Sequence, residues 1–378
     1  MTPADIDRMS KEYQAGDPRE GRLARALQVD VPVWRELGSE TLADLDEHVF
    51  GVGWWAPGPG TSRRILISDH LYNCVRSVET NLIEARLHLI EAMDFWERES
   101  DFHARAVSIT RDGNLKVEMP ERRRPLDEIT PAMGILHAIG FIRAIAGALD
   151  CFGASVVGVM ALRTSLLRAD LDSARRTLAA VSGAGAGEQV QAQFGADLET
   201  LIERAGPLGW FRWVIDVRNT LIHRGRRLQM SELRPVPSGI VGPDGRPVIR
   251  TDVIHQLPRD PGRSDVEMFL EAARAPVLTE SAAMTLLGVL ESTLRLIGEG
   301  GRLLLDVWRT RRGNPALLPQ PREQWPAGPS TATAGFEGYA PGSMPYDPTQ
   351  LRSDATLLRR MMGASLGDAA RGAWANFD

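Results

Sequence analysis

The sequence predicts a mainly α-helical protein, a helical bundle with β-hairpin insertions and a disordered C-terminal tail. Three observations predict it. Apolar residues recur at helical spacing over several long segments. Two Asp-Gly pairs stand between short apolar runs, a pattern typical of hairpin turns. Residues 313–350 contain eight prolines and five glycines among 38 residues, which favours disorder.

The chain has 378 residues, of which 43% are hydrophobic and 25% charged, so it can bury a substantial core. A weak helical pattern over 20–36 and a Gly/Pro/Trp-rich loop over 51–61 leave the fold of the N-terminal part open. The expected organisation is an N-terminal extension (1–69), a helical domain (70–312), a Pro/Gly-rich linker (313–350) and an amphipathic C-terminal peptide that fits a short helix (351–378).

Two long helices are expected to form the centre of the helical domain, over 70–102 and 130–168. The second is apolar on nearly every face, so it is either buried or forms half of an oligomer interface. Gly153 and Gly158 in it would admit a closely packed neighbour. The remaining helices are expected over 170–181, 188–205, 208–225 and 279–312.

The two hairpins are expected at 104–119 and inside an insertion at 228–263. In the first, Val107, Ile109, Leu115 and Val117 flank the turn that contains Asp112-Gly113. In the second, Ile240-Val241 and Val248-Ile249 flank Pro243-Asp244-Gly245.

Charge and cysteine content narrow the class of protein. The net charge of −5 argues against a nucleic-acid coat, although three arginine runs could bind phosphate locally. Solvated surface is the simpler explanation of any single run. These runs are Arg122 to Arg124, then Arg224, Arg226 and Arg227, and finally Arg309, Arg311 and Arg312. Cys74 and Cys151 are expected to be buried free thiols. The sequence indicates no signal peptide, membrane span, metal cluster or phosphate loop, so we expect a cytoplasmic protein without cofactor.

One segment, Trp213 to Gly225, combines a packed helix face with a polar one. On a helical wheel with Trp210 at zero and about 100° per residue, Val214, Val217 and Leu221 form the core stripe. Asn219, His223 and Arg226 fall on the opposite face, and Arg218 lies on the flank. Other Arg/His pairs of similar spacing, such as Arg98 with His103 and Arg250 with His255, lack this context. On the residues alone, a histidine that is solvated or caps the last carbonyls is the simpler explanation of His223.

The Arg218-Asn219-x-x-x-His223 block resembles the signature of the HEPN superfamily, in which two long helices precede a helix that carries arginine, a polar residue and histidine. The resemblance implies a metal-independent endoribonuclease, often a toxin or defence effector that acts as a homodimer. Other members are binding modules without catalysis. Gly225 stands where many toxins of the nucleotidyltransferase-paired type carry tyrosine, which argues against that subgroup.

The residues fit RNA cleavage by its own 2′-hydroxyl. His223 could act as base or acid, and Arg218 could neutralise charge that develops on the phosphoryl oxygens. Asn219 could orient the histidine or the phosphate, and Arg224, Arg226 and Arg227 could bind RNA phosphates. One motif holds a single histidine, so a homodimer would bring two copies of the motif together and supply both the acid and the base. Two alternatives stay open: a silent HEPN module that binds nucleic acid, nucleotide or a protein partner, such as an antitoxin, and a helical scaffold that docks through its C-terminal peptide.

Overall fold

The computed structural model describes residues 28–29, 31–45, 55, 61–109, 115–117, 125–164, 169–223, 230–241, 247–263, 277–319 and 340. The expected disordered linker and C-terminal peptide fall almost entirely outside these residues, as does most of the N-terminal extension.

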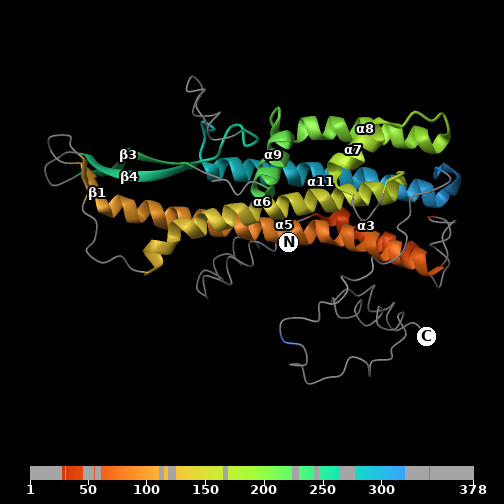
Figure 1. The fold of residues 1–378 in the computed structure, drawn as a ribbon, viewed down its shortest axis with the longest axis horizontal. Coiled ribbons are helices and arrows are strands. Elements are labelled where there is room, and N and C mark those ends of the chain that lie inside the picture. Colours follow the sequence, from red (N-terminus) through yellow and green to blue (C-terminus); the bar gives the residue numbers. More distant parts are fainter. Residues whose placement is uncertain are drawn as a thin grey trace. The chain divides into compact units, whose positions relative to one another are not determined.

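The described part is mainly α-helical, as the sequence predicts (Figure 1). Its elements are α3 (Pro32–Asp44), α5 (Thr61–Ala106), α6 (Pro125–Met160), α7 (Leu171–Ala179), α8 (Ala186–Ala205), α9 (Trp210–His223), α11 (Ala282–Gly313) and a short 3-10 turn (Pro315–Leu317), with strands β1 (Val107–Ile109), β2 (Leu115–Val117), β3 (Met230–Val241) and β4 (Pro247–Gln256).

Three helix boundaries differ from the expected ones. α5 begins at Thr61 rather than at His70, so the expected loop ends where the helix starts. α6 runs from Pro125 to Met160 instead of from 130 to 168. It ends there because Ala161 has a φ of 56°, a left-handed conformation that does not continue a helix. Of the weak helix expected over 20–36, residues 20–27 lie outside the described part of the structure, and α3 begins at Pro32, whose fixed φ suits a first helical position.

Both hairpins form antiparallel pairs. β1 pairs with β2 with Val107 opposite Val117 and Ile109 opposite Leu115, the four apolar residues that predict it. β3 pairs with β4 from Met230 opposite Gln256 to Val241 opposite Pro247, with a register shift between Pro237 and Val241. The second hairpin is therefore much longer than its turn alone predicts.

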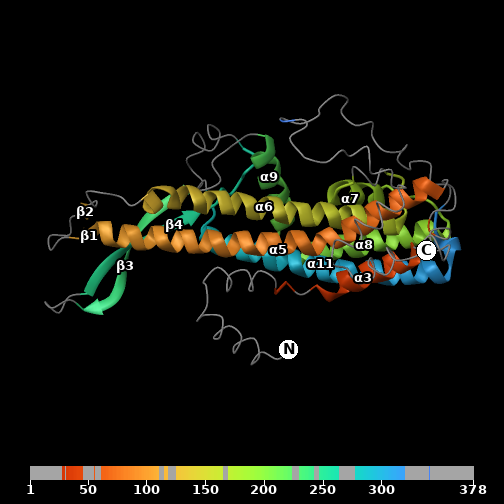
Figure 2. The ribbon, with the colours of Figure 1, turned by 90° about the horizontal axis from the view of Figure 1, so that it is seen from below.

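The chain divides into two compact units. The first comprises residues 1–31, 77–150 and 197–300, and the second comprises 32–76, 151–196 and 301–378. The first unit contains α5 from residue 77 onward and α6 as far as residue 150. These two helical segments lie side by side and antiparallel, and α9 runs across α6 (Figures 1 and 2). The β3–β4 hairpin joins this unit through β4, where the backbone N–H of Val253 donates to Ser100 of α5 (3.2 Å).

The second unit has an aromatic core. Trp34 meets Phe152 edge-to-face with ring centroids 5.7 Å apart. The two glycines expected to admit close neighbours do so: a Cβ on Gly153 would lie 2.2 Å from the backbone nitrogen of Leu171, and one on Gly158 would lie 2.5 Å from the Leu71 side chain. Both neighbours belong to this unit, so the small residues of α6 serve packing within one chain here.

The third arginine run is held by contacts within this unit, with Arg311 buried and Arg309 and Arg312 exposed. Arg309 pairs with Glu36 and Glu40 of α3, and Arg312 pairs with Asp44 (2.9 Å). Arg311 is buried and donates to the carbonyl of Val159 near the end of α6 (2.5 Å), and burial lowers the pKa of its guanidinium to about 10. This run therefore anchors α11 to neighbouring elements and is not a free phosphate-binding surface.

Two further features concern compartment. Cys74 is buried and Cys151 half-buried, neither forms a disulfide, and burial raises the pKa of Cys74 to about 12. Among the described residues, one stretch of α6, Glu128–Met160, is long and apolar enough to cross a membrane by length and composition. Half of its most apolar window is buried inside the protein, and the core helix of a soluble protein can meet the same criterion, so this stretch is weak evidence for a membrane span.

Candidate functional site

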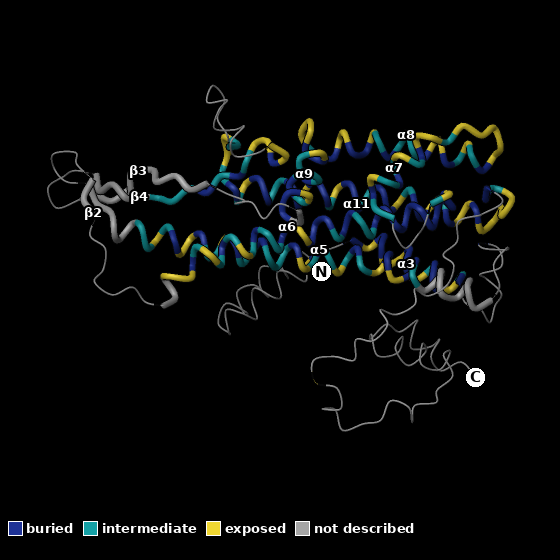
Figure 3. The backbone as a smooth tube through the Cα atoms, in the orientation of Figure 1, coloured by how far each residue is buried: buried dark blue, intermediate teal, exposed yellow. Residues whose placement is uncertain are grey.

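The helix that carries the predicted motif, α9, packs by the face that the sequence assigns to the core. Trp210, Val214, Val217 and Leu221 are all buried. Figure 3 shows how buried positions alternate with more exposed ones along the helices. The indole N–H of Trp210 donates to the carbonyl of Ile202 at the end of α8 (2.9 Å). The apolar stripe therefore fixes which side of α9 is turned outward.

Residues 258–263 form a strap that fixes α9 by two further hydrogen bonds. The indole N–H of Trp213 donates to the carbonyl of Pro258 (3.0 Å), and the buried hydroxyl of Thr220 donates to the carbonyl of Pro261 (2.7 Å). These two positions lie about two helical turns apart, so the strap holds α9 along half its length. Side chains on the outer face thus stand on a rigid helix, as a functional site requires.

The outer face carries polar residues. Asn219 is exposed, and one to two turns earlier Arg212 pairs with Asp216 (2.9 Å). At about 100° per residue, positions 212, 216, 219 and 223 fall within about 60° of one another. Position 223 is the last residue of α9, and its backbone is described. The side chain of His223 lies outside the described part of the structure, as do Arg224, Arg226 and Arg227, so the predicted grouping stays a prediction.

Arg218 is turned toward α6. Its guanidinium donates to the carboxylate of Asp150 at 2.6 Å, and the two side chains are 24% and 31% exposed. This ion pair uses one donor group of a side chain that has five N–H donors. Asp150 thus fixes the direction of Arg218 at the flank of α9 and reduces its free positive charge.

Asp150 is the residue that motif reasoning missed. It is a carboxylate in the most apolar of the described helices, and a charge in such a place requires a partner. That requirement was a usable signal, but the identity of the partner, 68 positions away, depends on the tertiary fold.

The other Arg/His pairs of similar spacing have different surroundings. His255 is buried, stacks on Trp96 with centroids 5.2 Å apart and lies 3.2 Å from the carboxylate of Glu99, so it ties β4 to α5. Arg98 pairs with Asp94 (2.7 Å), and His103 packs edge-to-face on Phe102.

A pair of histidines, which the sequence did not suggest, joins α5 to α6. The Nδ1 atoms of His88 and His137 lie 3.0 Å apart, and Phe95 stacks on His137. Burial lowers the pKa of His137, and the neighbouring His88 lowers it further, while Glu91 raises it. Within the described residues, no group of three or more His, Cys, Asp or Glu side chains could hold a metal ion.

Comparison of the chain with family models, with curated proteins and with solved structures gave no match, so the argument for function rests on the residues of α9 and their surroundings.

Proposed function

We propose that this protein is a metal-independent endoribonuclease of the HEPN type, with its active site at the C-terminal turn of α9. One observation carries the proposal: the exposed Asn219 and the oriented Arg218 lie within one turn or so of position 223 on a helix whose opposite face is buried. Three residues of the motif thus share one short, firmly held piece of backbone.

The proposed reaction is transfer of the phosphoryl group within the RNA. The 2′-hydroxyl loses its proton to a base, and its oxygen bonds to the adjacent phosphorus while the bond from phosphorus to the 5′-oxygen breaks. That oxygen takes a proton from an acid. The products are a 2′,3′-cyclic phosphate and a 5′-hydroxyl, and no external oxidant or reductant enters.

Arg218 would stabilise the transition state. Charge grows on the phosphoryl oxygens as the new bond forms, and a guanidinium binds two of them through its fork of donors. Asp150 would hold that guanidinium in place, as carboxylates do for metal-ligating histidines. Asn219 would orient the histidine or the phosphate, and Arg224, Arg226 and Arg227 would contact neighbouring phosphates.

His223 supplies one acid or base, whereas the reaction needs both. The proposal therefore includes a homodimer in which a second copy contributes the other histidine. A cytoplasmic toxin or phage-defence effector, held in check by an antitoxin-like or defence-system partner, is the biological role that suits such an activity.

The test is cleavage of end-labelled single-stranded RNA by purified protein in excess EDTA, with detection of cyclic phosphate ends. We expect His223→Ala to lower the rate by about 10²–10⁴ and Arg218→Ala to be comparably severe. Arg98→Ala and His103→Ala are matched controls, because they share the spacing but lie on α5, and they should keep full activity. Activity that vanishes with chelator, or survives in His223→Ala, would contradict the mechanism.

The ion pair to Asp150 also favours a second candidate function, a non-catalytic binding module. In that case Arg218 is a structural residue that joins α9 to α6. Arg218→Ala would then lower the melting temperature and leave a protein that binds RNA or a partner without cleaving RNA at all. A catalytic Arg218 predicts the reverse, a large loss of rate in a protein of near-normal stability.

A further inference from the structure

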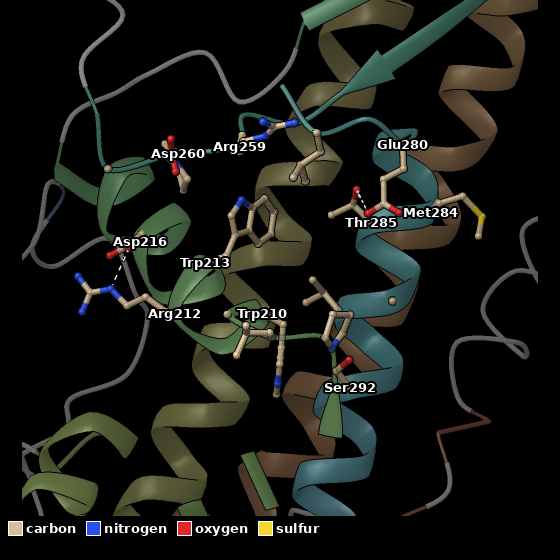
Figure 4. A pocket seen from close by; sticks show the side chains of 18 of the residues that line it. Trp210, Arg212, Trp213, Asp216, Arg259, Asp260, Glu280, Met284, Thr285 and Ser292 are labelled. Atoms are coloured by element: carbon tan, nitrogen blue, oxygen red, sulfur yellow. Dashed lines mark hydrogen bonds and ion pairs between the residues drawn. The ribbon is translucent and has the colours of Figure 1, made fainter. Parts of the chain in front are cut away.

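A pocket of about 630 Å³ opens between the N-terminal half of α9, the strap 258–263 and the N-terminal part of α11 (Figure 4). All of its walls belong to the first compact unit. Its volume lies within the range of roughly 300–1,000 Å³ that is usual for ligand pockets. The proposed cleavage site, at the other end of α9, does not use it.

Two tryptophans give the pocket a fixed aromatic wall. Trp213 is partly exposed, and its hydrogen bond to Pro258 holds the plane of its indole ring. Trp210, largely buried at the base, is held in the same way by Ile202. Such rings lose little conformational freedom when a flat group stacks on them, so the wall suits a planar aromatic ligand.

The charged residues around the pocket balance. Three arginines and three carboxylates line it: Arg212, Arg259 and Arg263, and Asp216, Asp260 and Glu280. A phosphate would find no net positive charge here, whereas a neutral heterocycle with hydrogen-bonding edges would find donors and acceptors. On α11, the hydroxyl of Thr285 donates to Oε1 of Glu280 (2.8 Å), which orients that carboxylate.

We propose that this pocket binds one base of single-stranded RNA, stacked on Trp213, close to the bond that is cut. The inference rests on the proposed function and assigns part of its substrate specificity. Single strands are recognised by stacking of unpaired bases on aromatic side chains, with hydrogen bonds to the base edges. α9 links the base pocket to the proposed cleavage site, because Trp213 and Asn219 are about 9 Å apart along the helix axis. A few consecutive nucleotides of single-stranded RNA can span that distance.

The Glu280 carboxylate gives the pocket a preference. A carboxylate accepts a hydrogen bond from an exocyclic amino group, as it does from cytosine. Adenine, cytosine and guanine have such a group and uracil does not. We therefore expect RNA with an amino-bearing base at the bound position to be preferred, and Glu280→Gln to weaken that preference.

Gly288 offers a way to block the pocket without disturbing the fold. It lines the pocket from α11, and a Cβ placed on it would meet no atom within 4 Å. Gly288→Leu should therefore fill the space, and leucine is favoured over glycine inside a helix. Gly298→Leu is the matched control: it lies on the same helix, is equally open at the Cβ position and does not line the pocket.

The measurement is fluorescence anisotropy of short 2′-O-methyl oligonucleotides, which cannot undergo 2′-hydroxyl attack, with an abasic residue moved through each position in turn. For wild-type protein, removal of one particular base should weaken binding about 5- to 150-fold, the usual contribution of one stacked base. Gly288→Leu should bind intact RNA about as weakly as wild-type protein binds the abasic RNA. Removal of the base should not lower the affinity of this variant further. Gly298→Leu should behave as wild type.

The outcomes separate the two proposals. If His223-dependent cleavage occurs but Gly288→Leu keeps wild-type affinity and base preference, the pocket inference is overturned and the ribonuclease stands. If the pocket variant loses RNA binding but wild-type protein never cleaves RNA, the inference stands and the ribonuclease fails. Exposed Leu208 and Met284 at the pocket would also suit a protein partner; wild-type protein that binds no RNA would overturn both proposals.

Discussion

The guanidinium of Arg218 on α9 donates to the carboxylate of Asp150 on α6 across 2.6 Å. Asp150 lies in α6, the most apolar helix in the described part of the chain, ten residues before the end of that helix at Met160. The pair therefore joins the helix that carries the proposed site to the helix at the centre of the predicted bundle. Its two side chains remain partly exposed, so a substrate phosphate can reach the donors of Arg218 that Asp150 does not use.

Asp150→Asn tests whether this pair positions Arg218 for catalysis. The amide keeps the size and one acceptor oxygen but removes the charge, so the guanidinium should be oriented less firmly. We expect kcat for RNA cleavage to fall by about 10- to 100-fold, by analogy with carboxylates that orient metal-ligating histidines. KM should change little. A variant with full activity but lower thermal stability would instead make the pair structural only.

Leu221→Ala and Asn219→Ala test which face of α9 packs. Leu221 is 9% exposed on the buried stripe, so its truncation should lower the free energy of unfolding by about 2–5 kcal/mol. Asn219 is exposed on the opposite face, and its loss should change that free energy by no more than about 0.5 kcal/mol. Urea unfolding followed by circular dichroism measures both. Equal destabilisation by the two variants would mean that the faces are assigned wrongly.

Much of the fold follows from local pattern. The long helices, both hairpins and the buried stripe of α9 are encoded in residues close together in the sequence, and the structure has all of them. The sequence pattern predicts an end of α6 at residue 168, because apolar periodicity continues past Met160. In the structure, Ala161 leaves the helical conformation and ends the helix earlier. A single left-handed residue leaves no trace in a hydrophobic pattern.

The surroundings of the motif depend on contacts distant in sequence. The sequence places Asn219 on an exposed face and Arg218 at the edge of that face. It does not show that Arg218 forms an ion pair with Asp150. It likewise cannot place Trp213 opposite Thr285 across a pocket, because α9 and α11 meet only in the folded chain. The Arg309 to Arg312 run was open to two explanations for the same reason: its carboxylate partners lie on α3.

His137 predicts a pH dependence of stability. Burial, and then the neighbouring His88, lower its folded-state pKa below 6.5, so the unfolded chain takes up this proton more readily. The contribution of neutral His137 to the free energy of unfolding is fully present above pH 6.5. It is lost as the pH falls through 6.5 toward the folded-state pKa. The free energy of unfolding should therefore decrease from pH 7 to pH 5. His137→Gln should show a smaller decrease, and an unchanged slope would remove His137 as its source.

The homodimer prediction concerns exposed apolar side chains on the paired helices. Met93 of α5 and Ile129 and Leu136 of α6 are 43%, 51% and 56% exposed. We expect Leu136→Glu to shift sedimentation from dimer toward monomer and to abolish cleavage in proportion, because each site would lose its second histidine. Arg302→Glu, an exposed charge reversal on α11, should do neither.

Mixing experiments show whether the two histidines act together. If one active site uses His223 from both copies, a heterodimer of wild type and His223→Ala is inactive. After subunit exchange, activity should then fall as the square of the wild-type fraction, because only wild-type pairs cleave. If each copy acts alone, activity falls linearly with that fraction. A linear fall, or wild-type protein that sediments as a monomer at tens of micromolar, would remove the second histidine from the mechanism and require another acid or base on the same chain.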